Sequence, residues 1–146
     1  MTGVMLRFTA HIDGGARGNP GPAGWGAVIH APTGAIAAEL NGAIPHATNN
    51  VAEYEGLLAA LRWCQAQGVT AVHVRSDSLL LVQQMRGVYK VKSDLLKPLY
   101  GQARLLAHQV GQVTFEHIPR ERNKDADRLA NLAMDEAAES TCAKPS

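Results

Sequence analysis

The sequence has few cysteines, no long apolar run and almost no net charge. Its two cysteines, Cys64 and Cys142, lack the number and spacing of a disulfide framework or a zinc site, so we expect free thiols in a reducing compartment. No run of about 18 apolar residues and no secretory-type start are present, so we expect a cytoplasmic protein without a membrane span. A formal net charge of +1 over 146 residues means that any nucleic-acid contact must come from local clusters.

The glycine-rich segment from Gly14 to Gly24 lacks the lysine and the serine or threonine of a nucleotide P-loop, so we do not expect ATP binding. The run before it, from Leu6 to Asp13, alternates apolar and polar side chains, as a strand with one buried face does. We expect the glycines and prolines after Asp13 to end this strand in a sharp turn. A carboxylate then stands at the carboxyl end of a buried strand, where open α/β sheets usually bind ligands.

The remaining pattern predicts a single α/β domain over residues 1–146, with residues from about 140 to 146 as a flexible tail. Apolar runs predict strands at residues 25–30 and 35–40, which form a hairpin, and at residues 71–77 and 113–118. Helices are predicted at residues 51–67, 78–86, 93–108 and 123–138, with Ser93 capping the third of these. Because a helix connects the first strand to the strand at 71–77, we expect these two strands to be parallel neighbours.

Four acidic residues fall where this arrangement brings strand ends and helix starts to one edge of the sheet. Asp13 and Asp77 end the two parallel strands, while Glu53 and Asp127 lie in the first turns of helices. Crowded carboxylates repel each other and their pKa values rise unless a cation sits among them. Oxygen ligands without a histidine or cysteine cluster favour Mg²⁺ over Zn²⁺, and two such ions roughly 4 Å apart suit in-line phosphodiester hydrolysis. The pattern therefore predicts a metal-dependent phosphodiesterase.

Each acid also has a purely structural interpretation. Asp13 could be a turn residue that accepts a hydrogen bond from its own backbone. Glu53 could complete a capping box with Asn50. Asp77 could cap the helix that follows it, and Asp127 could complement a helix dipole. The joint placement of all four at one edge favours the metal site.

Four segments carry a resemblance to a known family: IDGGARGNPGPAGWGAVI, TNNVAEYEGLLAAL, VRSDSLLLVQQM and HIPRERNKDADRLANLA. In this order, and with these acids, they make the chain from Phe8 to about Ala138 similar to type 1 ribonuclease H. The resemblance implies a ribonuclease H-like α/β fold, with a five-stranded mixed sheet in the order 3-2-1-4-5 flanked by helices. It also implies endonucleolytic cleavage of the RNA strand of RNA·DNA hybrids with two Mg²⁺ ions, or Mn²⁺, which leaves 5′-phosphate and 3′-hydroxyl ends.

The choice of the fourth acid rests on this resemblance. The segment RERNKDADRLA holds two candidate aspartates, Asp125 and Asp127. The family spacing of asparagine, three residues and aspartate runs from Asn123 to Asp127, which selects Asp127 as the metal ligand. Asp125 is then a charge at the start of a helix.

The resemblance also maps substrate contacts onto small polar residues. Asn19 and Asn49 correspond to positions that approach the RNA strand, where 2′-hydroxyls distinguish it from DNA. Thr48 and Asn50 correspond to a pocket for a DNA phosphate. As an alternative, Asn49 and Asn50 simply form a turn and a helix cap.

Two sites depart from the better-known bacterial relatives. Leu79 stands where many relatives carry a glutamine that contacts the hybrid, so one polar contact is lost. The connection Pro119 to Arg122 is shorter than the loop that carries a mobile histidine in those relatives. No histidine clearly replaces it, because His117 lies in a strand and is expected to be structural. Arg120 or Arg122 could meet phosphate charge instead.

A third departure is the missing basic, tryptophan-bearing protrusion. The cluster Arg86, Lys90, Lys92 and Lys97 is either a modest substitute or solvated surface. A non-cleaving binder of the same fold is the second functional hypothesis, and the four acids argue against it. The third is a nuclease for double-stranded RNA or DNA junctions, since the short HIPRER connection resembles that of compact members credited with some double-stranded RNA cleavage. We expect a monomer whose partner is the RNA·DNA hybrid, with double-stranded RNA as a second candidate substrate.

Overall fold

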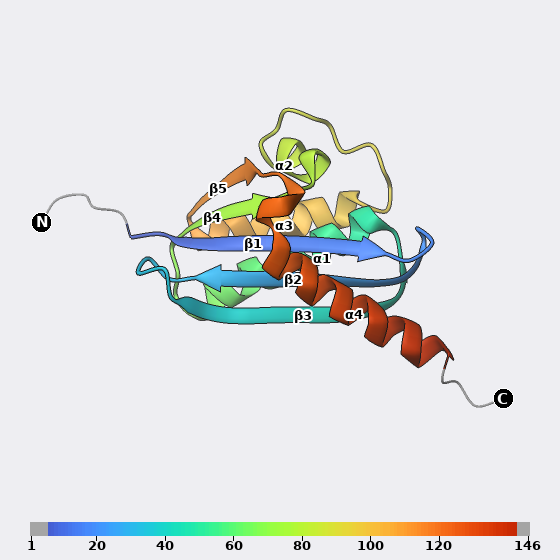
Figure 1. Cartoon of the computed structure of the whole chain (residues 1–146). Helices are drawn as coiled ribbons and strands as arrows, with labels where there is room; N and C mark the ends of the chain where they lie inside the picture. The colour runs from blue at the N-terminus through green and yellow to red at the C-terminus, as the bar shows by residue number, and fades with distance from the viewer. Residues whose placement is uncertain (1–5, 143–146) are drawn as a thin grey trace, which may run out of the picture.

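The protein is described by a computed structural model that covers residues 6–142, with side chains up to residue 140 (Figure 1). Its five strands form one mixed sheet in the order β3-β2-β1-β4-β5, which confirms the predicted order. β1 and β4 are parallel, as are β4 and β5, while β2 pairs antiparallel with both β1 and β3. The strand bounds are β1 Phe8–Ala16, β2 Gly21–His30, β3 Ile36–Ala47, β4 Ala71–Ser76 and β5 Gln112–His117.

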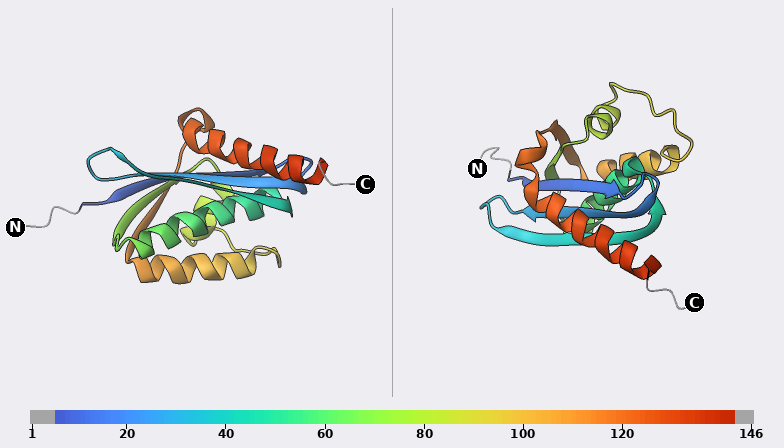
Figure 2. Two further views of the ribbon diagram at one scale, coloured as in Figure 1. Left: turned by 90° about the horizontal axis from the view of Figure 1, so that it is seen from below. Right: turned by 45° about the vertical axis from the view of Figure 1, so that its right-hand side comes forward.

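Helices cover both faces of this sheet, as Figure 2 shows. The helices are α1 Asn49–Ala66, α2 Leu79–Met85, α3 Lys97–Val110 and α4 Lys124–Cys142, with a short 3₁₀ helix η1 at Arg120–Arg122. α1 packs against one face with α3 behind it, and α4 crosses the other face. Among the described residues, no helix has the length and apolar character needed to span a membrane.

The main core lies between α1 and the sheet because alternate residues of the central strands face that side. Ala10 and Ile12 of β1 are completely buried, as is Val74 of β4. They pack against Leu57 and Leu58 of α1. The intervening residues of β1 and β4 therefore face the α4 side, and Asp13 of β1 belongs to this second set.

Glycines let both helices approach the sheet beside Asp13, since Gly14 follows Asp13 in β1 and Gly26 pairs with Asp13 from β2. A Cβ on Gly14 would lie 2.4 Å from the backbone carbon of Ala52 in α1, and one on Gly26 would lie 2.5 Å from the carbonyl oxygen of Ala126 in α4. Real side chains do not tolerate such distances, so any larger residue would push the helices away. The glycines thus set the distance between the helices and the acidic side chains.

The prediction that glycines end the first strand at Asp13 is wrong. β1 continues to Ala16, and Gly14 and Gly15 pair with Trp25 and Gly24 of β2. The turn consists of residues 17–20 instead. The glycines serve close packing rather than chain reversal, and a strand can contain glycine when its neighbours need the space.

Three further boundaries differ from the predicted ones. β3 extends to Ala47 instead of residue 40, because it pairs with β2 as far as Gly21. α3 begins at Lys97 with no side-chain cap, so Ser93 does not cap it. α4 continues to Cys142, so the predicted flexible tail is helical as far as that residue, and residues 143–146 lie outside the described part.

Candidate active site

The end of the parallel pairing between β1 and β4 brings two acids together. The last paired residues are Ile12 and Ser76, so Asp13 and Asp77 follow directly on neighbouring strands. Glu53 reaches them from α1, which packs over Gly14. One carboxylate oxygen from each of Asp13, Glu53 and Asp77 lies within 4.8 Å of the other two. Three of the four predicted acids therefore form one cluster.

The fourth acid, Asp127, lies in the first turn of α4 and lines the same cavity of about 590 Å³ as the other three. It is not part of the tightest group, and its side chain is 33% exposed. Asp125, the alternative, lines a different cavity beside His11. The geometry therefore places Asp127, and not Asp125, beside the cluster.

Burial and mutual repulsion raise the pKa values of the clustered carboxyls. Asp13 and Glu53 are only 7% and 8% exposed. Burial, the nearby Asp77 charge and a hydrogen bond with Asp127 raise the pKa of Asp13 to about 8. Burial, followed by the charges of Asp13 and Asp77, raises the pKa of Glu53. Burial also raises the pKa of Asp77, against a hydrogen bond from Asn123 that lowers it.

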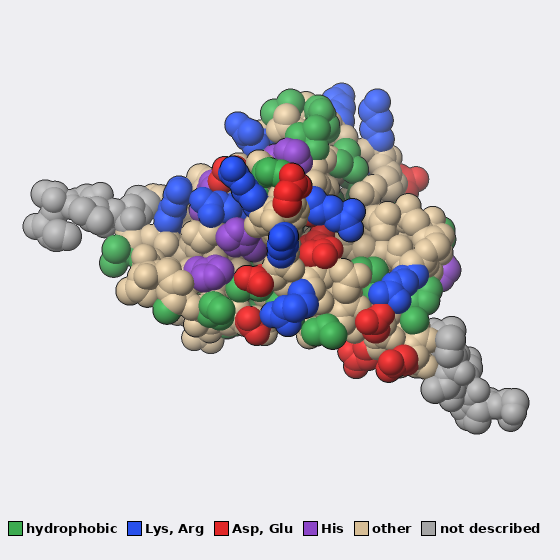
Figure 3. Space-filling view, viewed as in Figure 1, with side chains coloured by type: hydrophobic (Ala, Val, Ile, Leu, Met, Phe, Trp, Pro, Cys, Tyr) green, Lys and Arg blue, Asp and Glu red, His purple; other side chains and the backbone are tan. Residues whose placement is uncertain are grey.

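The cluster has the properties of a cation site. One oxygen of Glu53, Oε2, is buried and has no hydrogen-bond partner within the described chain. Arg120 stands at the rim of the cavity, 3.9 Å from Asp127, with its side chain 80% exposed. A set of buried oxygens without histidine or cysteine suits a hard divalent ion. Figure 3 shows carboxylates near the centre of this face with lysines and arginines around them.

Neighbouring residues perform the structural roles that the acids could have had. Thr48 is the N-cap of α1 and accepts a hydrogen bond from the Val51 N–H, so Glu53 is not part of a capping box. Glu53 lies in the second turn of α1 rather than the predicted first. Ser78 caps α2 by accepting from the Leu81 N–H, so Asp77 does not. The carboxylate oxygens of these two acids are therefore left for other partners.

Two of the predicted substrate residues connect the β1–β2 turn to the start of α1. The Asn49 N–H donates to Asn19 Oδ1 at 2.9 Å, and Asn49 Oδ1 accepts from the Ala16 N–H at 2.7 Å. Asn49 also lines the acidic cavity, whereas Asn19, Thr48 and Asn50 lie outside its lining. Asn19, Asn49 and Asn50 are exposed. The Oδ1 atoms of Asn19 and Asn49 thus accept hydrogen bonds from the backbone, which leaves their Nδ2 donors for a ligand.

The two predicted arginines separate in the structure. Arg120 lines the acidic cavity, on the same side as Asp77 and Asp127. Arg122 lines the smaller cavity that also contains Asp125. The 3₁₀ geometry of η1 directs them to different sides, so only Arg120 stands next to the acids.

Two residues of the site were not predicted from the sequence. His117 ends β5 and lines the cavity, with Nε2 3.3 Å from the carbonyl oxygen of Asp77. Asn123 is buried and donates from Nδ2 to the carbonyl oxygen of Ile12 at 2.8 Å, which fixes the start of α4 against β1. His117 follows from the same reasoning that found Asp77, because it pairs with Ser76 at the end of a parallel strand. No local signal identified the hydrogen bond of Asn123.

Comparisons with known proteins agree with this architecture. A family model described as reverse transcriptase-like matches residues 11–133. The bifunctional protein Rv2228c of Mycobacterium tuberculosis is 50% identical over 139 residues, which cover 94% of this chain but only 38% of that protein. The solved N-terminal RNase H domain of Rv2228c is 49% identical with a TM-score of 0.90, and the match covers 94% of this chain and 99% of that one.

Two further relatives match over most of the chain. Ribonuclease HI of Halobacterium salinarum is 40% identical, and the match covers 90% of this chain and 66% of that protein. The crystal structure of LC11-RNase H1 in complex with an RNA/DNA hybrid is 46% identical with a TM-score of 0.85, covering 90% of this chain and 99% of that one. LC11-RNase H1 was isolated from compost by a metagenomic approach.

Proposed function

Because the chain belongs to the type 1 ribonuclease H family, we propose that it cleaves the RNA strand of RNA·DNA hybrids as a metal-dependent endonuclease. The observation that carries this proposal is the cluster of Asp13, Glu53 and Asp77, whose oxygens lie within 4.8 Å of one another. A relative of the same fold, LC11-RNase H1, was crystallised with such a hybrid. A hybrid-binding protein without catalysis would gain nothing from burying three mutually repelling acids.

The residues of the cavity are suited to hold two divalent ions, with Mg²⁺ as the first candidate and Mn²⁺ as the second. Asp13 is central, because it lies beside Glu53 and Asp77 on one side and Asp127 on the other. Bound divalent ions would supply an activated water and stabilise the leaving oxygen of an in-line phosphodiester displacement. The expected products carry 5′-phosphate and 3′-hydroxyl ends.

Other residues of this surface would bind and orient the substrate. Asn49 lines the cavity and keeps its Nδ2 donor for a ribose hydroxyl, with Asn19 beside it. Thr48 and Asn50 stand at the start of α1, where small polar groups can approach a DNA phosphate. Arg120 at the rim can meet phosphate charge. His117 is a further candidate for orienting groups beside Asp77.

A cleavage assay with matched substrates tests this proposal. Labelled RNA·DNA hybrid, double-stranded RNA and double-stranded DNA of one sequence are offered in parallel with Mg²⁺, Mn²⁺ or chelator. We expect cleavage of the RNA strand in the hybrid with either metal and none with chelator. Cleavage of double-stranded RNA as well would identify the second candidate substrate, while cleavage that persists in chelator would contradict the metal-dependent mechanism.

Single substitutions then assign the acids. Asp13→Asn is nearly isosteric and removes the central charge, so it should abolish cleavage while hybrid binding remains. Asp127→Asn should reduce cleavage strongly, and Asp125→Asn, two residues away in the other cavity, is its matched control. The proposal fails if Asp13→Asn retains full activity, and the assignment of Asp127 fails if Asp125→Asn has the larger effect.

A further inference from the structure

α4 crosses only part of its sheet face and leaves the region beside the start of β1 and the end of β2 uncovered (Figure 1). In this uncovered region, the register pairs Thr9 of β1 with His30 of β2 on one side and His73 of β4 on the other. His11 of β1 likewise pairs with Arg75 of β4. Paired residues on neighbouring strands face the same side of a sheet. Polar side chains from three strands therefore gather on an open surface, and Figure 3 shows the histidines and several arginines or lysines on this part of the face.

Part of this surface forms a cavity of about 350 Å³ without any carboxylate in its lining. The lining consists of two arginines, two histidines and a threonine, together with residues of the β2–β3 turn: Arg7, Arg75, His11, His30, Thr9, Ala31, Pro32 and Gly34. The two imidazole rings stand edge to face with their centroids 5.8 Å apart. The chemical groups that line the cavity are thus hydrogen-bond donors and cations, which indicates an anionic ligand.

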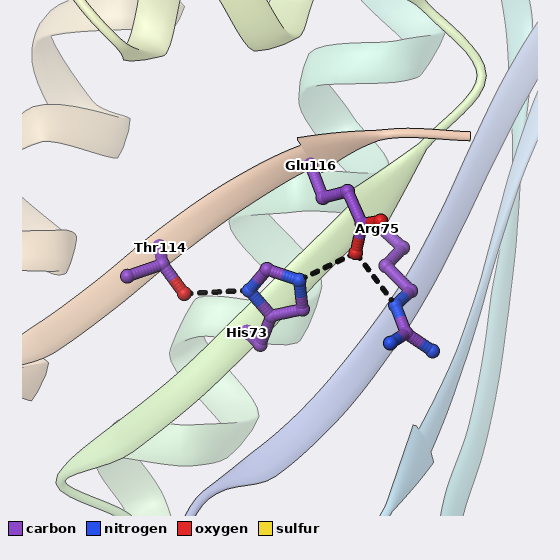
Figure 4. Close-up of polar contacts among 4 residues, drawn as sticks. All are labelled: His73, Arg75, Thr114 and Glu116. Atoms are coloured by element: carbon purple, nitrogen blue, oxygen red, sulfur yellow. Dashed lines mark hydrogen bonds and ion pairs between the residues drawn. The ribbon is translucent and has the colours of Figure 1, made fainter.

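A hydrogen-bond network between β4 and β5 orients one of these arginines (Figure 4). Glu116 Oε1 accepts from Arg75 Nε at 3.0 Å and contacts His73 Nε2 at 2.7 Å. His73 Nδ1 in turn contacts Thr114 Oγ1 at 2.6 Å. Figure 4 shows the two terminal nitrogens of Arg75 directed away from Glu116. Because Glu116 uses only Nε, these nitrogens remain for a ligand with two acceptor oxygens.

His11, which lines the same cavity, has a ring nitrogen without a hydrogen-bond partner in the described part of the chain. His11 Nδ1 is buried and has no hydrogen-bond partner among the described residues. Buried polar atoms are nearly always paired, and an orphaned one calls for a ligand or water that completes it. The two carboxylates whose charges act on His11, those of Glu116 and Asp125, belong to the network and to the adjoining cavity. Neither carboxylate lines the cavity of Arg7 and Arg75, which therefore remains open to an external anion.

We propose that this cavity binds a phosphate group, supplied either as free phosphate or as a phosphodiester of a nucleic-acid strand. The lining supplies two guanidinium groups, a hydroxyl and imidazole nitrogens, which are enough donors for the several oxygens of a phosphate. The lining shares no residue with that of the acidic cavity. The site does not depend on the proposed nuclease function.

Titration of the metal-free protein with inorganic phosphate tests this site. Amide chemical shifts are followed at constant ionic strength, and we expect saturable shifts at His11, Gly34 and Arg75 with a Kd of about 1 mM. Arg7→Gln and Arg75→Gln should each weaken binding by about tenfold, since each removes a charge-assisted hydrogen bond. Arg62→Gln, on α1 at the opposite face, is the matched control and should bind as the wild type does.

Arg7 is exposed and outside the strands, so its substitution keeps the test valid even if Arg75→Gln disturbs the sheet. A short single-stranded DNA without terminal phosphate provides the second arm. Shifts of the same amides with this DNA would identify phosphodiesters as the source, and shifts with phosphate alone would identify the free anion. The site is refuted if neither ligand moves these amides, or if Arg62→Gln weakens binding as much as Arg7→Gln. Asp13→Asn should leave phosphate binding unchanged, which separates this result from any failure of the nuclease proposal.

Discussion

Replacing Asp13 by asparagine should stabilise the metal-free protein at neutral pH. The pKa of Asp13 rises from its ordinary value of 3.8 to about 8 in the folded state, chiefly through burial and the Asp77 charge. The folded state therefore binds more protons than the unfolded state between these two values. Under that condition the free energy of unfolding falls as the pH rises through the window, and at pH 7 the loss reaches about 4 kcal/mol. Asparagine carries no charge at any pH, so the variant avoids this loss.

Urea denaturation at several pH values measures the effect. In chelator, we expect Asp13→Asn to exceed the wild type in free energy of unfolding by about 2–4 kcal/mol at pH 7 and to lose that advantage near pH 4. Asp94→Asn is the control, because the Asp94 side chain is 97% exposed and its pair with Lys97 contributes little. Its stability should change by less than about 0.5 kcal/mol at either pH.

Adding Mg²⁺ should reverse the order. An ion that binds the folded wild type stabilises it by about 4.1 kcal/mol at a concentration one thousand times its Kd, whereas Asp13→Asn has lost the central ligand and gains little. A variant less stable than the wild type in chelator at pH 7 would contradict a raised pKa at Asp13. A stability difference that stayed constant from pH 4 to pH 7 would contradict it equally.

Four other substitutions probe the scaffold and the substrate surface. Asn123→Ala should cost about 1–3 kcal/mol in urea denaturation, because it leaves the buried Ile12 carbonyl without its 2.8 Å hydrogen bond. Gly26→Ala should lower the free energy of unfolding by about 1–3 kcal/mol or more, and it should lower cleavage because it displaces α4 together with Asp127. Gly101→Ala is its control, because an added Cβ there meets nothing within 4 Å, and it should stabilise α3 by about 0.5–1 kcal/mol. Leu79→Gln places a polar side chain at a position that is 46% exposed, and it should lower the KM for the hybrid severalfold with kcat unchanged. An unchanged KM would mean that residue 79 does not contact the substrate.

The parallel pairing of β1 with β4, and with it the meeting of Asp13 with Asp77, was predicted from the residues alone, whereas the full sheet order was implied by the family resemblance. The parallel pairing follows from alternating strands and a helical crossover, which are local patterns joined by a general topological rule. The prediction of a turn at the glycines after Asp13 is wrong, because their role depends on Ala52 and Ala133, which pack against Gly14 and Gly24 from helices distant in the sequence. Local propensity contains no information about such partners.

The helix starts show the same limit. Thr48 and Asn50 are both acceptable N-caps by composition, and only the path of β3 as far as Ala47 decides that Thr48 caps α1. Serine is also a common N-cap residue, so Ser93 could have started α3. A turn at residues 94–96 follows it instead, and α3 begins at Lys97. His117 was placed in its strand correctly, but its contact with Asp77 required the register between β4 and β5.

The division of labour around the acids explains why their oxygens remain available. Thr48 and Ser78 each satisfy an N–H group in the first turn of α1 and α2, and Asn123 satisfies the carbonyl of Ile12, the last β1 residue that pairs with β4. With these needs met by neutral side chains, Asp13, Glu53 and Asp77 are held together by packing, at the expense of raised pKa values and an orphaned Glu53 Oε2. The repulsion among these acids does not stabilise the fold, whereas a bound divalent cation would offset it directly. The free energy of unfolding of the metal-free protein therefore measures how strongly the crowded acids destabilise the fold.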